Sequence, residues 1–448
     1  MWQIEKKYDV IIIGAGLAGL TSALKLSKDN KKILLIEKEN YLGGRASSWN
    51  SNNLFIEAGF HKHIGFYKEL PNVLYESNVN LNDIVTWDNE VEIILNKKEK
   101  IIFGIDPICH PIIFIKDLLG NNEILTLKDK LSLSKFFLIG FKEYLLRPQS
   151  LDRYSIKEYA NKLNIEKNVI DTIIKSLSTG IFFLPIENYS AKLFFGLFYP
   201  GIFNIHKIRI GAYNNGMSEI LAKPISKTII ENNGIIKNNT IVTSLIEKNG
   251  KIIGIKTEKE KIYSKLTILA TDIGNTKKIL KNIKHPYINK ILNIPTISVI
   301  TAHKELKNPA MKLDRTTFTP KLNMIVSFSE ESRTTFKKSS GRLSIILKST
   351  KEINSLSDEE IIKRIIKELK SINIKIEKEI LKYRIVRHID KFYNFSPNND
   401  KKRPKTKTPI KGLILAGDYT KQKLYSTMEG AVISGINAYN EAIKQLEN

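Results

Sequence analysis

The stretch that decides the fold reads Tyr8-Asp9-Val10-Ile11-Ile12-Ile13-Gly14-Ala15-Gly16-Leu17-Ala18-Gly19-Leu20. A mostly β-branched apolar run leads straight into G-x-G-x-x-G, and Leu17, Leu20 and Leu24 then follow at helical spacing. This order predicts a strand, a tight turn and a helix without a gap. A pyrophosphate can lie at the start of such a helix, where free N–H groups and the positive end of the helix dipole meet it. The stretch therefore predicts the first unit of a dinucleotide-binding fold.

The three glycines of the motif have separate physical roles. Gly14 permits the sharp turn, Gly16 lets the backbone approach the pyrophosphate, and Gly19 lets the helix pack close to the strand. The whole motif is therefore predicted to bind the cofactor: Gly14, Ala15, Gly16, Leu17, Ala18 and Gly19.

A second strand with a carboxylate at its end completes the unit. Ile33-Leu34-Leu35-Ile36 is apolar throughout and ends at Glu37, close to the spacing of about 20 residues expected for a carboxylate that holds a ribose hydroxyl. Glu37 and the adjacent Lys38 are therefore predicted to bind the cofactor. The alternative is an ordinary strand–helix–strand unit that binds no ligand.

The composition is that of a globular enzyme. The chain has 448 residues, of which 42% are hydrophobic, and this length is sufficient for two domains. No stretch approaches about 18 uninterrupted apolar residues, so we expect no transmembrane helix. The first strand begins close to the N-terminus, so we expect no signal or transit peptide and a cytoplasmic location. The single cysteine, Cys109, excludes an internal disulfide, and His61 and His63 have no cluster of acidic or cysteine partners, so no metal is expected.

The net charge of +25 indicates either an anionic partner or a compositional cause. Nucleic acid and an anionic membrane surface are the physical candidates. The lysines are scattered and no nucleic-acid-binding motif is present, so we expect no nucleic acid and favour the membrane surface. The alternative is a biased coding composition, because Lys, Asn and Ile are over-used together.

A second glycine motif indicates which dinucleotide is bound. Gly43-Gly44-Arg45 follows the acidic strand end, where two glycines suit another close backbone approach and the arginine can contact phosphate or ribityl groups. At this distance behind the first motif, it indicates FAD rather than NAD. The segment Phe55 to Gly65 then predicts a short strand and a loop. It resembles the FAD-dependent amine oxidase and carotenoid desaturase superfamily, whose acidic-x-Gly-x-His stretch lies beside the flavin, which implies the same place for Gly59 and His61.

The pattern from about Tyr67 to Gly211 is mostly helical. A loop at Asn121-Asn122-Glu123 precedes an apolar-rich helix from Leu127 to Arg147, and Ser155 to Ser178 is a further helical stretch.

Two aromatic runs follow, Ile181-Phe182-Phe183-Leu184-Pro185 and Leu193-Phe194-Phe195-Gly196-Leu197-Phe198-Tyr199-Pro200-Gly201-Ile202-Phe203. They are too short to span a bilayer, but they can line a lipid-sized cavity or dip into a membrane surface. The alternative is that they form the core of a second domain. Lys135, Lys142 and Arg147 lie beside apolar helix positions and favour a membrane surface as a partner.

The pattern beyond Gly216 is largely β, after a helix that opens at Gly216 to Leu221. The expected strands are Ile241 to Ile246, Lys251 to Lys256, Lys261 to Tyr263, Leu266 to Asp272 and Ile380 to Ile389. Asp358 to Ser371 is a strongly amphipathic helix. Asn399 to Lys411 is polar, basic and proline-bearing, so we expect a surface linker there.

The C-terminal motif repeats the physics of the N-terminal one. Leu413 to Thr420 predicts a buried strand that ends in Gly417 and Asp418, and Thr427-Met428-Glu429-Gly430-Ala431 opens the last helix. An acid at a strand end can bind the ribityl hydroxyls, and a helix N-terminus can stabilise negative charge on the reduced flavin. The block resembles the carotenoid desaturases of the plant and cyanobacterial phytoene desaturase type, which carry L-A-G-D-Y-T-K-Q-K and then S-M-E-G-A-V-x-S-G.

This resemblance covers most of the chain and implies noncovalent FAD with a quinone or another electron acceptor. It implies that Gly417, Asp418, Met428 and Ala431 contact the flavin, and that the backbone of Val242 holds the adenine.

Two positions depart from the patterns of these relatives. Amine oxidases of the superfamily tend to place an aromatic residue where this chain has Thr427, so the departure favours an apolar substrate over an amine. Plant-type desaturases carry an arginine near the segment that here reads Tyr199-Pro200-Gly201, so the electron acceptor stays open.

The predicted fold class is α/β. It comprises an FAD-binding Rossmann-like domain, doubly wound and three-layered, and a discontinuous α+β substrate domain. The FAD-binding domain is expected at residues 1–70, 212–285 and 405–448, and the substrate domain at residues 71–211 and 286–404, with helices that can contact a membrane.

The predicted function is desaturation of phytoene or a related isoprenoid hydrocarbon, with hydride transfer from an allylic CH₂ to flavin N5. Glu429 and His61 are the candidate catalytic side chains, and the partners expected are an apolar isoprenoid, a quinone or other acceptor, and a membrane surface. The alternatives are a squalene-type dehydroxylase, a carotenoid isomerase or an amine oxidase on the same fold. A more distant alternative is a flavin-binding, membrane-associated protein without turnover.

Overall fold

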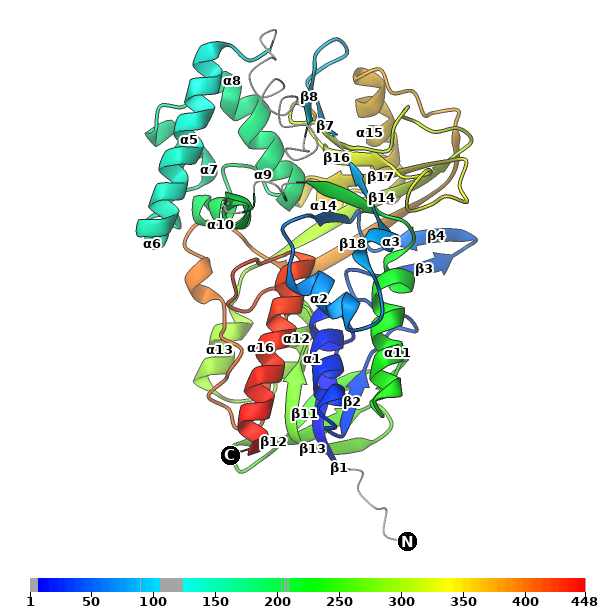
Figure 1. Cartoon of the computed structure of the whole chain (residues 1–448), viewed down its shortest axis with the longest axis vertical. Coiled ribbons are helices and arrows are strands. Elements are labelled where there is room, and N and C mark those ends of the chain that lie inside the picture. Colours follow the sequence, from blue (N-terminus) through cyan, green and yellow to red (C-terminus); the bar gives the residue numbers. More distant parts are fainter. Residues whose placement is uncertain are drawn as a thin grey trace.

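A computed structural model describes residues 7–88, 90–104, 124–202, 204, 207 and 209–447. Two large sheets lie one beyond the other along the long axis of the molecule, each with helices packed on it (Figure 1). Three features of the sequence lie outside the described residues: Cys109, the loop at Asn121-Asn122-Glu123, and Phe203 at the end of the second aromatic run.

The first sheet is built around the N-terminal strand. Its strands have the order β10-β2-β1-β13-β12-β11, and β19 pairs with β13. Their bounds are β1 Lys7–Ile13, β2 Ile33–Ile36, β10 Ile235–Lys237, β11 Val242–Lys248, β12 Lys251–Thr257, β13 Lys261–Leu269 and β19 Leu413–Leu415. β1 pairs in parallel with β2 and β13, so that Val10 lies opposite both Ile33 and Leu266. Because both faces of these strands are covered, β1 ends in a continuous apolar run from Val10 to Ile13 rather than an alternating pattern.

Helices from both ends of the chain pack together on this sheet. α1 (Leu17–Lys28) lies between α16 (Met428–Glu447) and α11 (Lys223–Glu231), as Figure 1 shows. Ser22 Oγ donates a hydrogen bond across the α1–α16 contact to the carbonyl oxygen of Gly435, at 3.0 Å. The first and last helices therefore form one layer.

The second sheet is mixed, with the strand order β18-β14-β17-β16-β15-β7-β8. Its strands are β7 Glu90–Ile94, β8 Lys100–Gly104, β14 Thr296–Leu306, β15 Thr316–Phe318, β16 Ile325–Glu330, β17 Gly341–Leu347 and β18 Ile380–Tyr393. Alternate residues of β14 point to opposite faces of the sheet. Ile300 and Ala302 pack in an apolar core with α14 (Lys351–Ser355) and α15 (Asp358–Ser371), whereas Val299 and Thr301 line a cavity on the other face.

A group of helices packs beside the mixed sheet. They are α5 Leu127–Leu146, α6 Pro148–Leu151, α7 Ile156–Lys162, α8 Lys167–Val169, the π-helical turn η1 Ile170–Ile174, α9 Lys175–Phe182 and α10 Ala191–Ile202. Phe136 of α5 packs between Phe194 and Phe195 of α10, and all three rings are fully buried. These contacts support the interpretation that the second aromatic run forms part of the core of a second domain.

The remaining elements connect the two sheets. They are β3 Ser48–Ser51, β4 Leu54–Glu57, β5 Lys62–Ile64, α2 Glu69–Tyr75, α3 Leu81–Ile84, β6 Val85–Asp88, β9 Ile210–Tyr213, η3 Ser218–Ala222, α12 Ile273–Leu280, α13 Pro286–Leu292 and η4 Asp400–Lys402. β3 pairs with β4, and β9 lies between β5 and β6.

The region from Tyr67 to Gly211 is mostly helical, as expected, although β6, β7, β8 and the start of β9 also lie within it. One expectation about secondary structure is wrong. The stretches Lys261 to Tyr263 and Leu266 to Asp272 are not separate strands, because β13 runs through both as far as Leu269 and Asp272 caps α12 instead.

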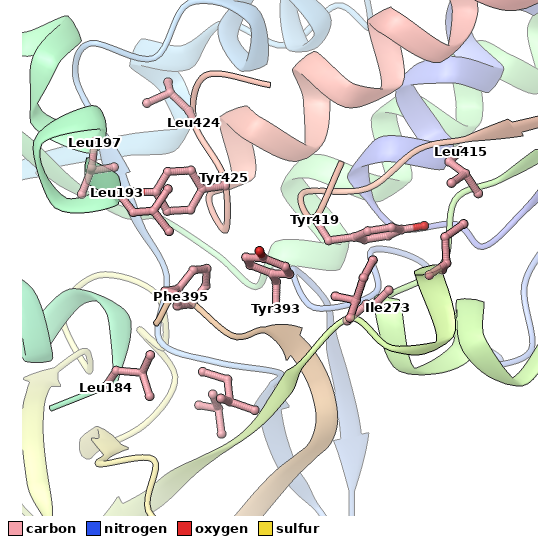
Figure 2. Close-up of a cluster of buried hydrophobic side chains, with 14 of the residues drawn as sticks. Leu184, Leu193, Leu197, Ile273, Tyr393, Phe395, Leu415, Tyr419, Leu424 and Tyr425 are labelled. Atoms are coloured by element: carbon pink, nitrogen blue, oxygen red, sulfur yellow. The ribbon is translucent and has the colours of Figure 1, made fainter. Parts of the chain in front are cut away.

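The expected surface linker from Asn399 to Lys411 is also wrong in its central part. Arg403 is 5% exposed and donates hydrogen bonds to the carbonyl oxygens of Tyr419 and Thr420. Its guanidinium lies 5.2 Å from the ring centroid of Tyr425. Figure 2 shows Tyr425 next to Leu193 and Phe395 and close to Tyr393 in the buried cluster of this region. The basic residues of this segment therefore include a buried arginine that stabilises the C-terminal motif by hydrogen bonds to its backbone.

Candidate active site

A cavity of about 760 Å³ lies between the two sheets. All cofactor-binding residues expected from the sequence line it except Ala15 and Gly19: Gly14, Gly16, Leu17, Ala18, Glu37, Lys38, Gly43, Gly44, Arg45, Gly59, His61, Val242, Gly417, Asp418, Met428 and Ala431. Residues from both ends of the chain thus meet around one space.

One end of the cavity reaches the turn between β1 and α1. Gly14 has φ of +99°, a left-handed conformation that favours glycine. A Cβ on Gly16 would meet no heavy atom within 4 Å, so the space in front of the helix is open. The first turn of α1 carries no acidic residue, and Gly16 contributes no side-chain cap. No side chain of this turn therefore competes with an anion for the helix N-terminus.

Ala15 and Gly19 shape the turn instead of lining the cavity. The Ala15 N–H donates to Glu37 Oε2 at 2.8 Å, which ties the turn to the end of β2. A Cβ on Gly19 would lie 1.9 Å from the carbonyl oxygen of Gly14, so a side chain at Gly19 cannot be accommodated without moving the backbone.

Glu37 is 8% exposed and holds its carboxylate at the wall of the cavity. Its Oε1 also accepts the N–H of Glu39 at 3.1 Å. A carboxylate has about four acceptor sites, so capacity is left for a ribose hydroxyl. Lys38 forms an ion pair with Glu39 at 2.9 Å, and Val242 lines the cavity from the start of β11.

The second glycine motif and the C-terminal motif contact each other through Arg45 and Asp418. Arg45 forms an ion pair and a hydrogen bond with Asp418, and Ser426 Oγ donates to the second Asp418 oxygen at 3.1 Å. The Arg45 guanidinium also lies 4.5 Å from the ring centroid of Phe392. Because both partners of the pair line the cavity, the charges of the two motifs are held in place together.

His61 and an unexpected histidine lie on the same wall. His61 Nδ1 is 3.6 Å from Glu57 Oε2, and this buried nitrogen has no hydrogen-bond partner among the described residues. His388 of β18 donates from Nε2 to the carbonyl oxygen of Ala58 at 2.5 Å. Burial lowers the pKa of His388 to about 4, so the ring is neutral at physiological pH. His388 is not among the residues expected from the sequence, although it lies in the predicted strand Ile380 to Ile389.

His63 does not share this site. It is fully buried, and its Nδ1 lies 3.0 Å from the hydroxyl of Tyr213. Within the described part of the chain, no group of three or more His, Cys, Asp or Glu residues could hold a metal ion.

The start of α16 forms another wall, through Thr427, Met428 and Ala431. Glu429 points elsewhere: its carboxylate accepts the N–H groups of Lys68, Glu69 and Leu70 at 2.8, 2.7 and 2.7 Å. Glu429 is absent from the cavity lining and is used to cap α2. The structure therefore places His61, but not Glu429, beside the cavity.

The other end of the cavity is largely apolar and lies against the mixed sheet and α9–α10. Its walls include Ile181, Phe183, Leu197, Val299, Phe318 and Ile346. Of the two aromatic runs, Leu197 from the second and Ile181 and Phe183 from the first contribute to it. The contributions of β14, β15 and β17 were not predictable from the sequence, because strand alternation shows which residues share a face but not what that face covers.

The residues present fit FAD. The open space at Gly16, the free helix start, the buried carboxylate of Glu37 and the Arg45–Asp418 pair all border one cavity. Its volume is within the usual range for ligand sites, about 300–1,000 Å³.

A profile of the flavin containing amine oxidoreductases matches residues 17–443. The chain belongs to this family. Members of the family contain a flavin, so the protein is an FAD-dependent oxidoreductase of the amine oxidase and carotenoid desaturase type.

Two curated members of the family span almost the whole chain. The 15-cis-phytoene desaturase of an Oncidium hybrid cultivar is 27% identical over 456 residues, covering 96% of this chain and 77% of the relative. The 15-cis-phytoene desaturase of Synechococcus elongatus is 25% identical, covering 95% of this chain and 94% of the relative.

Solved structures of other oxidoreductases share the fold. An oxidoreductase from Methanosarcina mazei superposes with a TM-score of 0.77 at 18% identity, covering 97% of this chain and all of the other. A putrescine oxidase bound to putrescine superposes with a TM-score of 0.73 at 16% identity, covering 98% and 99%. The predicted α/β class is confirmed: a parallel Rossmann-like sheet accompanies a separate mixed sheet.

Proposed function

We propose that this protein binds FAD noncovalently between its two sheets and desaturates a long isoprenoid hydrocarbon of the phytoene type. The observation that carries the proposal is the apolar end of the cavity, where Phe183, Leu197 and Phe318 continue directly from the residues that fit FAD. When bound, FAD supplies a two-electron acceptor for a hydride from the substrate. A hydrocarbon offers no polar group, so its binding free energy comes from apolar area, and this wall provides that area.

The expected division of the chain suits this arrangement and is part of the proposal. Residues 1–70, 212–285 and 405–448 bind FAD, and residues 71–211 and 286–404 bind the substrate. The proposed cofactor contacts are those expected from the sequence. His61 and His388 lie where the FAD-binding part of the cavity meets its apolar part. Val242 contributes its backbone to the adenine, and Ala15 and Gly19 act by shaping the phosphate turn.

An amine oxidase on the same fold is the competing function. The residue before Met428 supports the desaturase, because an aromatic ring there would help to hold an amine. Thr427 instead lines the cavity with a short side chain whose Oγ1 donates to the carbonyl oxygen of Leu424 at 2.7 Å and accepts the N–H of Gly430 at 2.9 Å. Its hydrogen-bonding capacity is used within the helix cap, which favours an apolar substrate.

Co-expression with a phytoene synthase tests the function. We expect a new polyene absorption band in the extracted pigment when the protein is present, and no band when Gly16→Trp fills the open space at the phosphate turn. Unchanged phytoene together with peroxide release from polyamines would instead support an amine oxidase. A quinone is the proposed electron acceptor, and flavin reoxidation by a quinone under anaerobic conditions tests it.

The proposal includes peripheral contact with an anionic membrane through α5. None of the helices in the described part of the chain is long and apolar enough to cross a membrane. α5 nevertheless exposes a leucine stripe of Leu127, Leu131, Leu138 and Leu145, each at least 56% exposed. These positions repeat on one face at about 3.5 to 3.6 residues per turn. Exposed Lys128, Lys135 and Lys142 flank the stripe, as in helices that lie in an anionic interface.

Sedimentation with vesicles tests this contact. We expect binding to vesicles with anionic lipid, weakened by salt and by Leu131→Ser with Leu138→Ser. Ile230→Ser is the matched control, because Ile230 is 59% exposed on α11, outside the stripe. Binding that is insensitive to the α5 changes would contradict the assignment.

A further inference from the structure

A chain of hydrogen bonds leaves the apolar end of the cavity and ends at a buried carboxyl group. We propose that Thr301, His303, Ser344 and Glu331 form a proton relay, which takes the proton released when the substrate is dehydrogenated. This inference rests on the proposed function for the origin of the proton. The relay itself is defined by geometry that does not depend on it.

The sheet register places the four residues in sequence. Thr301 and His303 are two residues apart on β14, so both lie on the face that borders the cavity. Across the strand pair, Thr301 lies opposite Ile346, which lines the cavity, and His303 lies opposite Ser344. His303 therefore lies two positions further along the strand pair than Thr301, outside the cavity lining. Glu331 follows β16 immediately and turns toward Ser344.

The distances form a continuous path. Thr301 Oγ1 lies 3.4 Å from His303 Nε2, and His303 Nδ1 lies 3.0 Å from Ser344 Oγ. Ser344 Oγ lies 2.5 Å from Glu331 Oε2. All four side chains are buried, with at most 3% exposed, so bulk water does not interrupt the path.

The direction of the hydrogen bonds sets which nitrogen can accept a proton. When Ser344 donates its hydroxyl proton to the Glu331 carboxylate, it can only accept from His303, whose Nδ1 then carries the proton. Nε2 keeps its lone pair and faces Thr301, which lines the cavity. Burial, with Arg342, His61 and His388 adding to it, holds the pKa of His303 well below its ordinary value, so the ring is neutral.

Glu331 is the proton acceptor at the far end. Burial raises its pKa to about 8; Glu57 adds to this effect, while Lys62, Arg342 and the hydrogen bond from Ser344 oppose it. Its proton affinity therefore exceeds that of His303. In the ionised form, which predominates above about pH 8, Glu331 receives a proton that enters at His303. The charged groups that face it from β4, β5 and β17 are thus Glu57, Lys62 and Arg342.

The transfer balances in atoms and electrons. The substrate loses a hydride from one carbon, for which bound FAD would be the two-electron acceptor, and a proton from the neighbouring carbon. The electron pair of the second C–H bond becomes the new π bond. Thr301 takes this proton as it gives its own to His303 Nε2; the Nδ1 proton passes to Ser344, and the Ser344 proton passes to Glu331. The products are the alkene, a neutral Glu331 and a neutral His303 with its proton on Nε2.

Infrared titration tests the relay without substrate. In the FAD-loaded protein we expect a protonated-carboxyl band that titrates with a pKa near 8, is absent in Glu331→Gln, and shifts in Ser344→Ala. Ser329→Ala is the matched control, because Ser329 lies opposite Ser344 on β16, is fully buried and does not line the cavity. A band that does not titrate, or that ignores Ser344→Ala while responding to Ser329→Ala, overturns the relay.

A second measurement follows flavin reduction by phytoene in the absence of oxygen. We expect Ser344→Ala and Glu331→Gln to slow this step by roughly 10²-fold and to remove its pH dependence near pH 8, with Ser329→Ala close to wild type. If these variants reduce the flavin as fast as wild type, the relay is wrong although the proposed function stands. If wild-type protein is not reduced by phytoene, the proposed function fails, and the infrared titration alone decides whether the proton path exists.

Discussion

Arg45 and Asp418 form an ion pair between residues 373 positions apart in the chain, and both line the cavity. Truncating one partner of a buried charge pair leaves the other charge unpaired, at a cost of about 2–5 kcal/mol. We therefore expect Asp418→Asn to weaken FAD binding by at least about ten-fold. The ratio of flavin to protein after dialysis measures this loss.

The Arg333–Asp314 pair provides the control for that experiment. It joins the same two residue types with Asp314 equally buried, but neither residue lines the cavity. Asp314→Asn should leave the flavin content unchanged. Equal losses of flavin in both variants would show that the effect comes from general destabilisation.

Substitutions at Gly16 and Gly19 distinguish an effect on FAD binding from an effect on folding. Gly16→Ala adds a Cβ that meets nothing in the protein, so the apoprotein should keep its melting temperature while FAD binds at least about ten-fold more weakly. Gly19→Ala places its Cβ 1.9 Å from the Gly14 carbonyl oxygen and should lower the melting temperature even without FAD. Calorimetry of the apoproteins and a flavin titration distinguish the two effects. Tight FAD binding by Gly16→Ala would contradict the place assigned to the pyrophosphate.

Glu429 is expected to act on stability. Glu429→Gln keeps the shape but removes the charge that accepts three N–H groups of α2, so the free energy of unfolding should fall by about 1–3 kcal/mol. Glu441→Gln on the same helix removes only a carboxylate bonded to Gln445 and should change it little. Denaturant unfolding provides both values. An unchanged unfolding free energy with lost flavin reduction would make Glu429 a catalytic group after all.

Lys304 gives stability a pH dependence. Its side chain is fully buried, its Nζ has no hydrogen-bond partner among the described residues, and burial lowers its pKa from about 10.5 to about 7. The folded state thus binds this proton less tightly than the unfolded state, so stability is lost as the pH falls from 10.5 to 7 and stays lost below. Lys304→Met should be more stable than wild type, with a gap that widens as the pH falls towards 7.

The matched control for this change is Lys307→Met, at an exposed position just after β14. Chemical unfolding of both variants between pH 6 and pH 10 provides the comparison. If the difference in free energy of unfolding between Lys304→Met and wild type is the same at every pH, the gain comes from apolar contact alone and the lowered pKa of Lys304 is contradicted.

The N-terminal unit could be predicted from the sequence because its determinants are local. The strand before Gly14, the helix after Gly16 and the strand that ends at Glu37 follow one another as expected. α15 begins and ends at the predicted residues for the same reason, since Ser357 and Glu360 form a capping box within one turn.

The parts that escaped prediction depend on partners far away in the chain. β7 is stabilised by β15, where Thr317 lies opposite Glu92 more than two hundred residues earlier, and no local pattern announces that pairing. Arg403 looked like part of a basic surface segment, but carbonyl groups of the C-terminal motif surround its guanidinium. His303 and Ser344 likewise become neighbours only through the register of β14 with β17.

The most direct test of the proposed function is anaerobic mixing of the FAD-loaded protein with phytoene in anionic vesicles. We predict bleaching of the flavin absorption, a new polyene band, and renewed flavin absorption when a quinone is added. Putrescine and other polyamines should leave the flavin oxidised. Bleaching by an amine, with no bleaching by phytoene, would contradict the proposed function.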